Sequence, residues 1–461
     1  MNPSGTHPRR ITGLETEYGC LVQPTNGGVS IVHQIRDWLF DQQRYGLIDL
    51  HERDWEEPPG NGGFLFNGGR LYIDMGHIEY CTPECASAVD VVRYDRAGDR
   101  LLLKAVTELG IENRAQLFRN NIDHRTGATF GCHENYSLLR QAPLTEENVL
   151  SLLAFLTLRV LFTGSGRMGA GGHASGVREV HGPAASGGFQ ISQRADFIEN
   201  DFYEWVQHNR AIINTRDEPL ADPLTYRRLH LLHGDTNVLP SALYLKVGAT
   251  RLVLDLLEIN ALPRVILMDA VKALRELSHQ PTPPWRIRLM DGTEADPVEI
   301  LSVFRKHAVR EFAGRNRETD AILDLWRRTE IGLASDLDTL VGLLDWVTKK
   351  HLLDAFRESE NLEWNDPWLE AQDLEYHHLD PSRSLGLAMA DLNGPWADGL
   401  DAPSTLECPP TDTRAAARSA ALAQLKGQSE GYEIDWHHLR LDEQRQIFLT
   451  DPFDSKLPSI G

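Results

Sequence analysis

Two short stretches of this 461-residue chain alternate polar and apolar side chains with a period of two residues, and the first lies near the N-terminus. Within RRITGLETEYGCLV, Glu15 and Glu17 fall on one side of an extended chain. Leu14, Thr16 and Tyr18 fall on the other side. Because successive side chains of a β-strand point to opposite faces, the pattern predicts a half-buried strand with two carboxylates on its polar face.

The second stretch, RLYIDMGHIEY, begins at Arg70 and is predicted to form another buried strand. Arg70, Tyr72 and Asp74 fall on one face of it, and the intervening apolar residues, through Met75, fall on the other. Arginine suits a phosphate or carboxylate ligand, and an aspartate facing the same cleft can accept a proton. The alternative is a simple ion pair between Arg70 and Asp74.

The carboxylates of Glu15, Glu17 and, on the second stretch, Glu79 form a candidate metal site. Alternate carboxylates on one strand lie two residue rises apart and repel one another when bare. A hard cation such as Mg²⁺, which prefers oxygen ligands, relieves that repulsion. The alternative is a solvated outer face of the sheet that binds nothing.

Basic residues gather in two further segments, RAIINTRDEP and YRRLHLLHGDTN, within an otherwise acidic chain. The cluster consists of Arg210, Arg216, Arg227, Arg228, His230 and His233. It favours an anion site, and the alternative is a network of surface salt bridges.

The segment CHENY places three possible metal ligands in a row, His133, Glu134 and Asn135. Adjacent residues on a strand point to opposite faces, so the three cannot all serve one site. The simplest interpretation of His133 is a buried, hydrogen-bonded core histidine.

Most of the remaining chain has helical patterns, at residues 29–43, 86–110, 145–163 and 298–360. Together with the strands they indicate an α+β fold, a mainly antiparallel sheet with helices on one face. Residues 164–188 contain nine glycines and predict a long loop. The GSGRMG at its start is not a dinucleotide site, because such a site needs a helix directly after it.

Composition shifts divide the chain into three parts. We expect a catalytic domain over residues 1–391, a linker rich in Pro, Gly and Asp over 392–413, and a small C-terminal domain over 414–461.

The overall composition excludes several classes of protein. The net charge of −21 argues against non-specific nucleic-acid binding. No apolar run has the length of a membrane span, and MNPSGTHPRR lacks the apolar stretch of a secretory signal. Five cysteines without C-x-x-C spacing indicate a reduced, cytoplasmic protein.

Taken together, these motifs resemble the Pup ligase and depupylase family, PafA and Dop, which is similar to the carboxylate–amine ligases of the glutamine synthetase type. The resemblance runs along nearly the whole chain. Eleven segments carry it, in this order: RRITGLETEYG, FNGGRLYID, HIEYCTPEC, FRNNID, GCHENY, FQISQRADFI, RAIINTRDEP, YRRLHLLHGDTN, PPTDTR, IDWHHLRL and TDPF.

The resemblance implies a glutamine synthetase-like fold, in which a concave antiparallel sheet binds Mg-ATP and a small C-terminal domain packs against it. Members act on Pup, a small disordered protein modifier. The ligase phosphorylates the side-chain carboxyl of Pup's C-terminal glutamate, and a lysine of a target protein attacks the acyl phosphate to form an isopeptide bond. The depupylase hydrolyses that bond. The implied partners are Pup or a Pup-like modifier, lysine-bearing targets and the proteasome pathway.

The resemblance also implies roles for single residues. The implied metal ligands are Glu15, Glu17, Tyr72 and Glu79, and the implied ATP contacts are Arg70, Thr82 and Trp436, the last from the C-terminal domain. Asp74 resembles the family's catalytic aspartate, which would accept the proton of the incoming lysine.

The motifs favour the ligase over the depupylase. The segment between the two acidic stretches is shorter than the depupylase insertion, and HIEYCTPEC and TDPF resemble the ligase. Against this, the stretch from Asp74 to Glu79 is one residue shorter than in the ligase, and FQISQRADFI resembles the depupylase. Two other classes stay open: a small-molecule carboxylate–amine ligase, and a non-catalytic binding module, against which the intact acidic residues argue.

Overall fold

The computed structural model describes residues 9–23, 30–41, 44–50, 57–123, 126–169, 188–204, 210–428 and 431–457. All statements below concern these residues.

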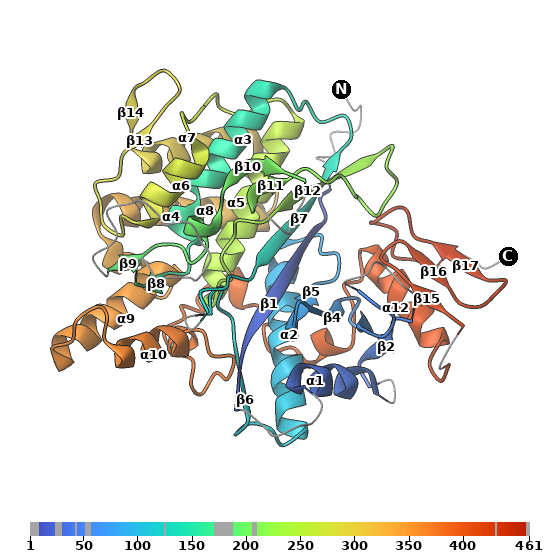
Figure 1. Cartoon of the computed structure of the whole chain (residues 1–461). Helices are drawn as coiled ribbons and strands as arrows, with labels where there is room; N and C mark the ends of the chain where they lie inside the picture. Colours follow the sequence, from blue (N-terminus) through green and yellow to red (C-terminus); the bar gives the residue numbers. More distant parts are fainter. Residues whose placement is uncertain are drawn as a thin grey trace.

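A ten-stranded sheet forms the centre of the molecule (Figure 1). Its order is β10-β11-β12-β7-β1-β5-β4-β3-β2, and β6 pairs with the second half of β1. The strands are β1 (Thr12–Val22), β2 (Gly46–Ile48), β3 (Gly62–Leu65), β4 (Arg70–Asp74), β5 (His77–Cys81), β6 (Ala115–Phe118), β7 (Cys132–Leu139), β10 (Asn200–Tyr203), β11 (Ala211–Asn214) and β12 (Tyr226–Leu231). Among the described pairings of this sheet only β10–β11 is parallel, which confirms the expected mainly antiparallel sheet.

The second acidic stretch is a hairpin rather than the single strand predicted from its sequence. β4 ends at Asp74, and β5 runs back antiparallel from His77. The two turn residues have positive φ angles, 44° at Met75 and 92° at Gly76, as in the tight turns that join hairpin strands. Met75 therefore leaves the buried face to which alternation assigned it, and its side chain is 84% exposed.

Helices cover the apolar face of the sheet, as expected for this class. Leu14 on β1 belongs to a core shared with α2 (Ala88–Glu108), α3 (Glu146–Leu158) and α5 (Pro240–Glu258). Tyr18 and Tyr80 belong to a second core with α1 (Ile31–Phe40) and α2. Along β1 the residues alternate between buried and half-buried, so the side that carries Glu15 is the more accessible one.

Further helices extend the molecule on the side of α5 (Figure 1). They are α4 (Val160–Thr163), α6 (Ala270–Ser278), α7 (Pro297–Phe312), α8 (Arg317–Ser335), α9 (Asp345–Glu360), α10 (Pro367–Glu375) and α11 (Leu385–Ala388), with 3-10 turns η2 (Ala195–Phe197), η3 (Leu337–Leu340), η4 (Pro395–Ala397) and η5 (Pro403–Leu406). Two short antiparallel pairs join β8 (Arg167–Met168) to β9 (Phe189–Gln190) and β13 (Ile287–Arg288) to β14 (Glu294–Ala295). Most of the predicted glycine-rich loop, residues 170–187, lies outside the described residues.

The C-terminal segment forms a small unit at the β2 edge of the sheet (Figure 1). It comprises α12 (Arg414–Gln424) and a three-stranded sheet of β15 (Glu433–Ile434), β16 (His438–Arg440) and β17 (Gln446–Phe448). Its core residues Leu422 and Ile434 cluster with Leu47 and Phe64 of the large sheet. This packing brings Trp436 next to the sheet.

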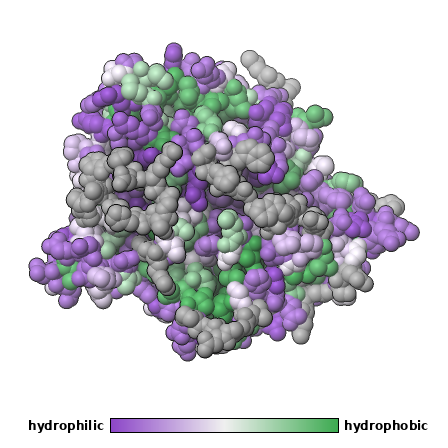
Figure 2. Space-filling model, in the orientation of Figure 1, coloured by the Kyte–Doolittle hydropathy of each residue, from purple (hydrophilic) through white to green (hydrophobic). Residues whose placement is uncertain are grey.

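No helix in the described part of the chain has the length and hydropathy to cross a membrane. Figure 2 shows hydrophilic residues spread over the visible face, with smaller groups of hydrophobic residues between them.

Candidate active site

Three carboxylates from three strands converge on the accessible face of the sheet. Glu17 on β1 lies opposite Glu79 on β5, and Glu79 lies opposite Tyr72 on β4. One oxygen each of Glu17, Asp74 and Glu79 lies within 4.8 Å of the other two. We call this group the carboxylate cluster. It brings Asp74 together with two of the acids that the sequence assigned to a metal.

The electrostatics of the cluster centre on Glu79, which is only 3% exposed. Burial and the neighbouring charges of Glu17 and Glu15 raise the pKa of Glu79 well above its ordinary value, although a hydrogen bond from Tyr72 opposes the shift. The Tyr72 hydroxyl donates that bond to Glu79 Oε1 at 2.5 Å. Packed acids of this kind suit an oxygen-binding cation such as Mg²⁺.

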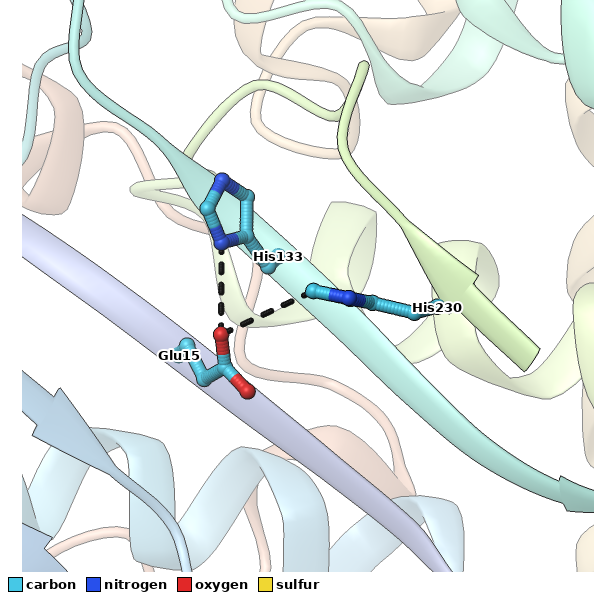
Figure 3. Close-up of side chains that lie close together, drawn as sticks. All are labelled: Glu15, His133 and His230. Carbon is cyan, nitrogen blue, oxygen red and sulfur yellow. Dashed lines mark hydrogen bonds and ion pairs between the residues drawn. The ribbon is translucent and has the colours of Figure 1, made fainter. Parts of the chain in front are cut away.

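The remaining predicted metal ligand, Glu15, lies in a second group with two histidines (Figure 3). Its Oε2 is 3.2 Å from His133 Nδ1 and 3.7 Å from His230 Nε2, and Asn135 donates to its Oε1 at 2.8 Å. Burial raises the pKa of Glu15, but the two histidine contacts outweigh it and leave that pKa well below its ordinary value. Burial lowers the pKa of His230 to about 4.

This second group corrects the interpretation of His133 as a core histidine. Alternation correctly places His133 and Asn135 on one face of β7 and Glu134 on the other, where Glu134 is fully buried. The sequence did not show that β7 pairs with β1 so that His133 lies opposite Glu15. The sequence alone does not reveal this register, and for that reason it could not place His133 beside Glu15.

A cavity of about 220 Å³ opens beside Glu15 of the second group. Its walls include all three residues expected to contact ATP, namely Arg70, Thr82 and Trp436, together with Glu15 and Tyr72. Tyr72 therefore lines the cavity and also binds Glu79 of the carboxylate cluster.

Arg70 is held by an acidic partner other than Asp74. Its guanidinium donates to Glu57 at 3.3 and 2.7 Å and lies 4.3 Å from the Tyr72 ring centre. The ion pair between Arg70 and Asp74, offered above as an alternative, is thus replaced by a pair with Glu57. The guanidinium is fixed at the wall of the cavity.

Thr82 and Trp436 are fixed by contacts on different elements. The Leu14 amide donates to Thr82 Oγ1 at 3.0 Å, which anchors the threonine to β1. The Trp436 ring meets Phe64 edge-on at 5.1 Å, and the Arg418 guanidinium lies 4.8 Å from the Trp436 ring centre. The indole is therefore packed between β3 and α12.

The basic cluster predicted from the sequence is divided in the structure. Arg227 and Arg228 line the cavity, whereas His230 contacts Glu15. Arg216 is 57% exposed and pairs with Glu218 at 2.6 Å, and the buried His233 lies 3.1 Å from the Leu156 carbonyl. The six residues therefore do not form a single anion site, because Arg216 is exposed and paired with Glu218, and His233 lies beyond the end of β12 and is buried.

Sequence reasoning also missed Arg194, which lies in the FQISQRADFI segment. Its side chain is 2% exposed, and its Nε and Nη1 have no hydrogen-bond partner among the described residues. Burial lowers the pKa of Arg194 to about 10, and the charge of Glu17 is the largest opposing influence. Unused buried donors close to Glu17 are suited to an anionic ligand.

Comparison with known proteins identifies the family. Residues 10–440 match the model of the family described as Pup-ligase protein. The chain belongs to the Pup-ligase family. This Pup-ligase family member is 36% identical to a Pup–protein ligase of Acidimicrobium ferrooxidans, over 97% of this chain and 96% of that protein. It is 35% identical to a depupylase of Acidothermus cellulolyticus, over 90% and 88% of the two chains.

Solved structures resemble this Pup-ligase family member along nearly its whole length. The ligase PafA in complex with the prokaryotic ubiquitin-like protein Pup is 30% identical, with a TM-score of 0.81 over 98% of this chain and 89% of that one. PafA in complex with ADP is also 30% identical, with a TM-score of 0.76 over 95% of each chain.

Proposed function

We propose that this chain is an ATP-dependent ligase that joins the C-terminal glutamate side chain of Pup, or of a Pup-like modifier, to a lysine of a target protein. Membership of the Pup-ligase family and the likeness to PafA bound to Pup support the proposal. One structural observation carries it. Tyr72 lines a cavity whose residues suit a nucleotide, and it also donates a hydrogen bond to Glu79 of the carboxylate cluster, which includes Asp74.

The nucleotide is proposed to lie in the cavity, and the ADP complex of PafA supports this. Trp436 would face the base, and Thr82 lines the same cavity. Arg70 offers a guanidinium to the phosphates, and Arg227 and Arg228 add positive charge at the same cavity. Cationic groups at this place would offset the charge that develops on a transferred phosphoryl group.

Magnesium is proposed to be held by Glu15, Glu17, Tyr72 and Glu79. The donor set fits in that it consists of oxygen atoms and in that Glu17 and Glu79 lie within 4.8 Å of each other and of Asp74, whereas Glu15 lies in the neighbouring group with His133 and His230. When bound, the ion would supply charge neutralisation and alignment of the phosphates. Tyr72 would keep the Glu79 carboxylate oriented through its hydrogen bond.

Asp74 is proposed to accept the proton of the attacking lysine. A lysine is protonated at neutral pH and must lose its proton before it attacks the acyl phosphate of the modifier. Asp74 lies at the end of β4, two residues beyond Tyr72 and four beyond Arg70 on one face. The strand therefore places nucleotide contacts and the proton acceptor in a fixed order.

An ATP-dependent conjugation assay tests the proposal. The protein, Mg-ATP, a modifier ending in glutamate and a lysine-bearing target are expected to give a conjugate of higher mass. Asp74→Asn should lose at least about a hundredfold in rate, the scale of general-base catalysis. Asp324→Asn, on the exposed surface of α8, is the matched control and should retain wild-type activity. The absence of any conjugate with wild type would refute the ligase.

The second candidate is a depupylase, which the relative from Acidothermus cellulolyticus supports. Incubation with a preformed conjugate separates the two. Release of the modifier without conjugation would assign the chain to the depupylase, and neither activity would favour a small-molecule carboxylate–amine ligase.

We further propose that the protein acts in the cytoplasm, as part of the proteasome pathway. Its five cysteines are free, as expected in a reducing compartment.

A further inference from the structure

Asp235 ties together the two chain segments on either side of the β8–β9 pair. Its carboxylate accepts from the Ser165 amide at 2.8 Å, before β8, and from the Ser192 hydroxyl at 2.9 Å, after β9. The amides of Gln193 and Arg194 donate to the same carboxylate at 2.9 and 3.1 Å. Asp235 is buried, and four donors satisfy its charge. They fix the backbone of the turn from which the Arg194 side chain leaves.

The turn that carries Arg194 is held against the part of the sheet that carries Glu17. Gln193 Oε1 accepts from the Asn121 amide at 2.6 Å, and the Asn121 side chain donates to the carbonyl that precedes Gly131 at 3.1 Å. The Gly131 carbonyl accepts from the Glu17 amide at 3.1 Å. A Cβ atom on Gly131 would lie 3.0 Å from Glu17 Oε1, so the Glu17 carboxylate lies over this glycine. The turn and the Glu17 end of the carboxylate cluster are therefore neighbours in the fold.

The Arg194 guanidinium is buried between charges of both signs, with two of its nitrogens unused. Nε and Nη1 make no hydrogen bond with any residue that the structure describes. Burial is the largest cause of its lowered pKa, and the neighbouring charges that act most on it are Glu17, which opposes the shift, and Arg210, which adds to it. Two guanidinium groups near each other repel, and a buried donor without a partner destabilises the protein. An anionic ligand at Arg194 would relieve both effects.

The nucleotide phosphates have other arginines available to them. The cavity proposed for ATP is lined by Arg70, Arg227, Arg228 and Arg414, and Arg194 is not among the described residues of its wall. The modifier proposed above supplies a different anion, because a C-terminal glutamate carries two carboxylates. The side-chain carboxyl is phosphorylated, whereas the main-chain carboxylate keeps its charge throughout the reaction. A charge that enters a buried site needs a partner there, and Arg194 offers one close to Glu17 and outside the cavity wall.

We propose that Arg194 binds the main-chain carboxylate at the C-terminus of the modifier, and that Asp235 positions Arg194 for this contact. A guanidinium group is planar and matches a carboxylate with paired hydrogen bonds. The contact would restrict the reaction to a glutamate that is the last residue of its chain, because any other glutamate has an amide in place of that carboxylate. The inference rests on the ligase function proposed above.

Equilibrium binding of two forms of the modifier tests the inference. Pup with its free C-terminal carboxylate, and Pup in which a carboxamide replaces only the main-chain carboxylate, are titrated calorimetrically into the full chain with Mg-ADP present. Wild type should bind the carboxylate form about thirtyfold more tightly, the scale of a hydrogen bond to a charged group. Arg194→Gln should bind both forms with the same affinity. Its melting temperature should equal or exceed that of wild type, because it loses an unpartnered buried charge. Arg327→Gln, on the exposed surface of α8, is the control and should keep the wild-type preference.

Two variants test the positioning role of Asp235. Asp235→Asn, and the milder Ser192→Ala that removes one of its four donors, should each reduce the preference for the carboxylate form to less than about tenfold. Asp345→Asn is the matched control. This buried carboxylate also accepts four hydrogen bonds, from Tyr376 and from residues 237–239. Its replacement should lower the melting temperature without changing the preference.

The possible results separate the parts of the inference. Equal affinity of wild type for the two forms would overturn it, and so would a wild-type preference that persists in Arg194→Gln. A preference unchanged in both Asp235→Asn and Ser192→Ala would show that Asp235 does not position Arg194. A wild type that binds neither form of Pup would instead refute the Pup-dependent function proposed above.

Discussion

The hydroxyl of Tyr72 and the carboxylate of Glu79 lie 2.5 Å apart across the β4–β5 pair. This hydrogen bond joins a wall of the cavity to the buried member of the carboxylate cluster. It also opposes the burial and like charges that raise the pKa of Glu79. The relationship makes Tyr72 the residue through which nucleotide and metal binding would be coupled.

Tyr72→Phe removes this bond while retaining the ring. We expect the apparent Mg²⁺ affinity of the ATP-dependent reaction to fall by about ten- to a hundredfold, the scale for groups that orient a metal ligand. A Mg²⁺ titration of the initial rate measures it. Tyr94→Phe, which removes a 2.9 Å bond to the Cys408 carbonyl outside the cavity, is the control. Equal Mg²⁺ dependence in the two variants would contradict the role given to Tyr72.

The raised pKa of Glu79 predicts how stability depends on pH. In the absence of divalent cations, the folded protein retains a proton on Glu79 at pH values where the unfolded chain has lost it. The contribution of Glu79 to the free energy of unfolding is complete below its ordinary pKa of 4.5. It is lost as pH rises through the higher pKa that Glu79 has in the folded protein. In EDTA, the melting temperature of Glu79→Gln should therefore rise relative to that of wild type as pH increases from about 5 to about 8.

Differential scanning fluorimetry at several pH values measures this difference. Glu108→Gln, at a surface position 45% exposed, should show the same pH profile as wild type. Mg²⁺ should raise the melting temperature of wild type more than that of Glu79→Gln. A difference between Glu79→Gln and wild type that is constant with pH would show that Glu79 is ionised in the folded protein throughout.

Glu134 and Arg159 form an ion pair on the opposite, helix-covered side of β7. Both side chains are 0% exposed, and two guanidinium nitrogens donate to the carboxylate at 2.8 and 2.6 Å. Glu134→Ala leaves Arg159 buried without its partner and should cost about 3–5 kcal/mol in the free energy of unfolding. Urea denaturation measures the loss. Glu294→Ala, in an exposed pair with Arg288, should cost less than about 1 kcal/mol.

The same pair should contribute to acid denaturation. Burial alone would raise the pKa of Glu134, but Arg159 and Lys246 outweigh it and lower that pKa to about 2. The stabilisation is complete above the ordinary value of 4.5 and is lost as pH falls toward about 2. Glu134→Ala should therefore weaken the pH dependence of stability in this range, and an unchanged acid profile would contradict the assignment.

Glu84 attaches the C-terminal unit to the large sheet. It accepts from Arg414 Nε at 2.7 Å and from Arg418 Nη2 at 2.6 Å, and Arg418 packs on Trp436. Glu84→Gln should misplace Trp436 and weaken ATP binding by about tenfold, the cost of one charged hydrogen bond. Isothermal titration with ATP measures it, and Glu407→Gln, on an exposed side chain, is the control.

This variant also tests the proposed domain boundaries. If residues 414–461 form a separate small domain, Glu84→Gln should increase proteolytic cleavage within 392–413 while the core of residues 1–391 stays resistant. Cleavage spread evenly over the chain would contradict a boundary there.

The sequence predicted the carboxylate face well because alternation is a local property. Glu15 and Glu17 on one side of β1, and Leu14 on the other, follow from the period of two residues alone. The same rule correctly separated Glu134 from His133 and Asn135. Alternation says nothing of which strand lies alongside, so the pairing of His133 with Glu15 and the split of the basic cluster required the tertiary structure.

The hairpin at Met75 was missed for a different reason. The residues on both sides of it are β-formers, and a Met–Gly turn lacks the asparagine or aspartate that usually marks such a turn. Gly76 was the available signal, since its φ of 92° suits glycine. The reversal turned one predicted strand into two and brought Glu79 back beside Tyr72.

The spacing of Arg70, Tyr72 and Asp74 on β4 restricts how the gene can change in length. One codon added between Arg70 and Asp74 would turn one end of the strand to the helix-covered side, so only paired additions preserve the order of the site. A codon gained or lost at Met75 and Gly76 alters the loop and leaves both strands in phase. We therefore expect length variation among relatives to collect at this turn, where it leaves the side chains of both strands on their present faces.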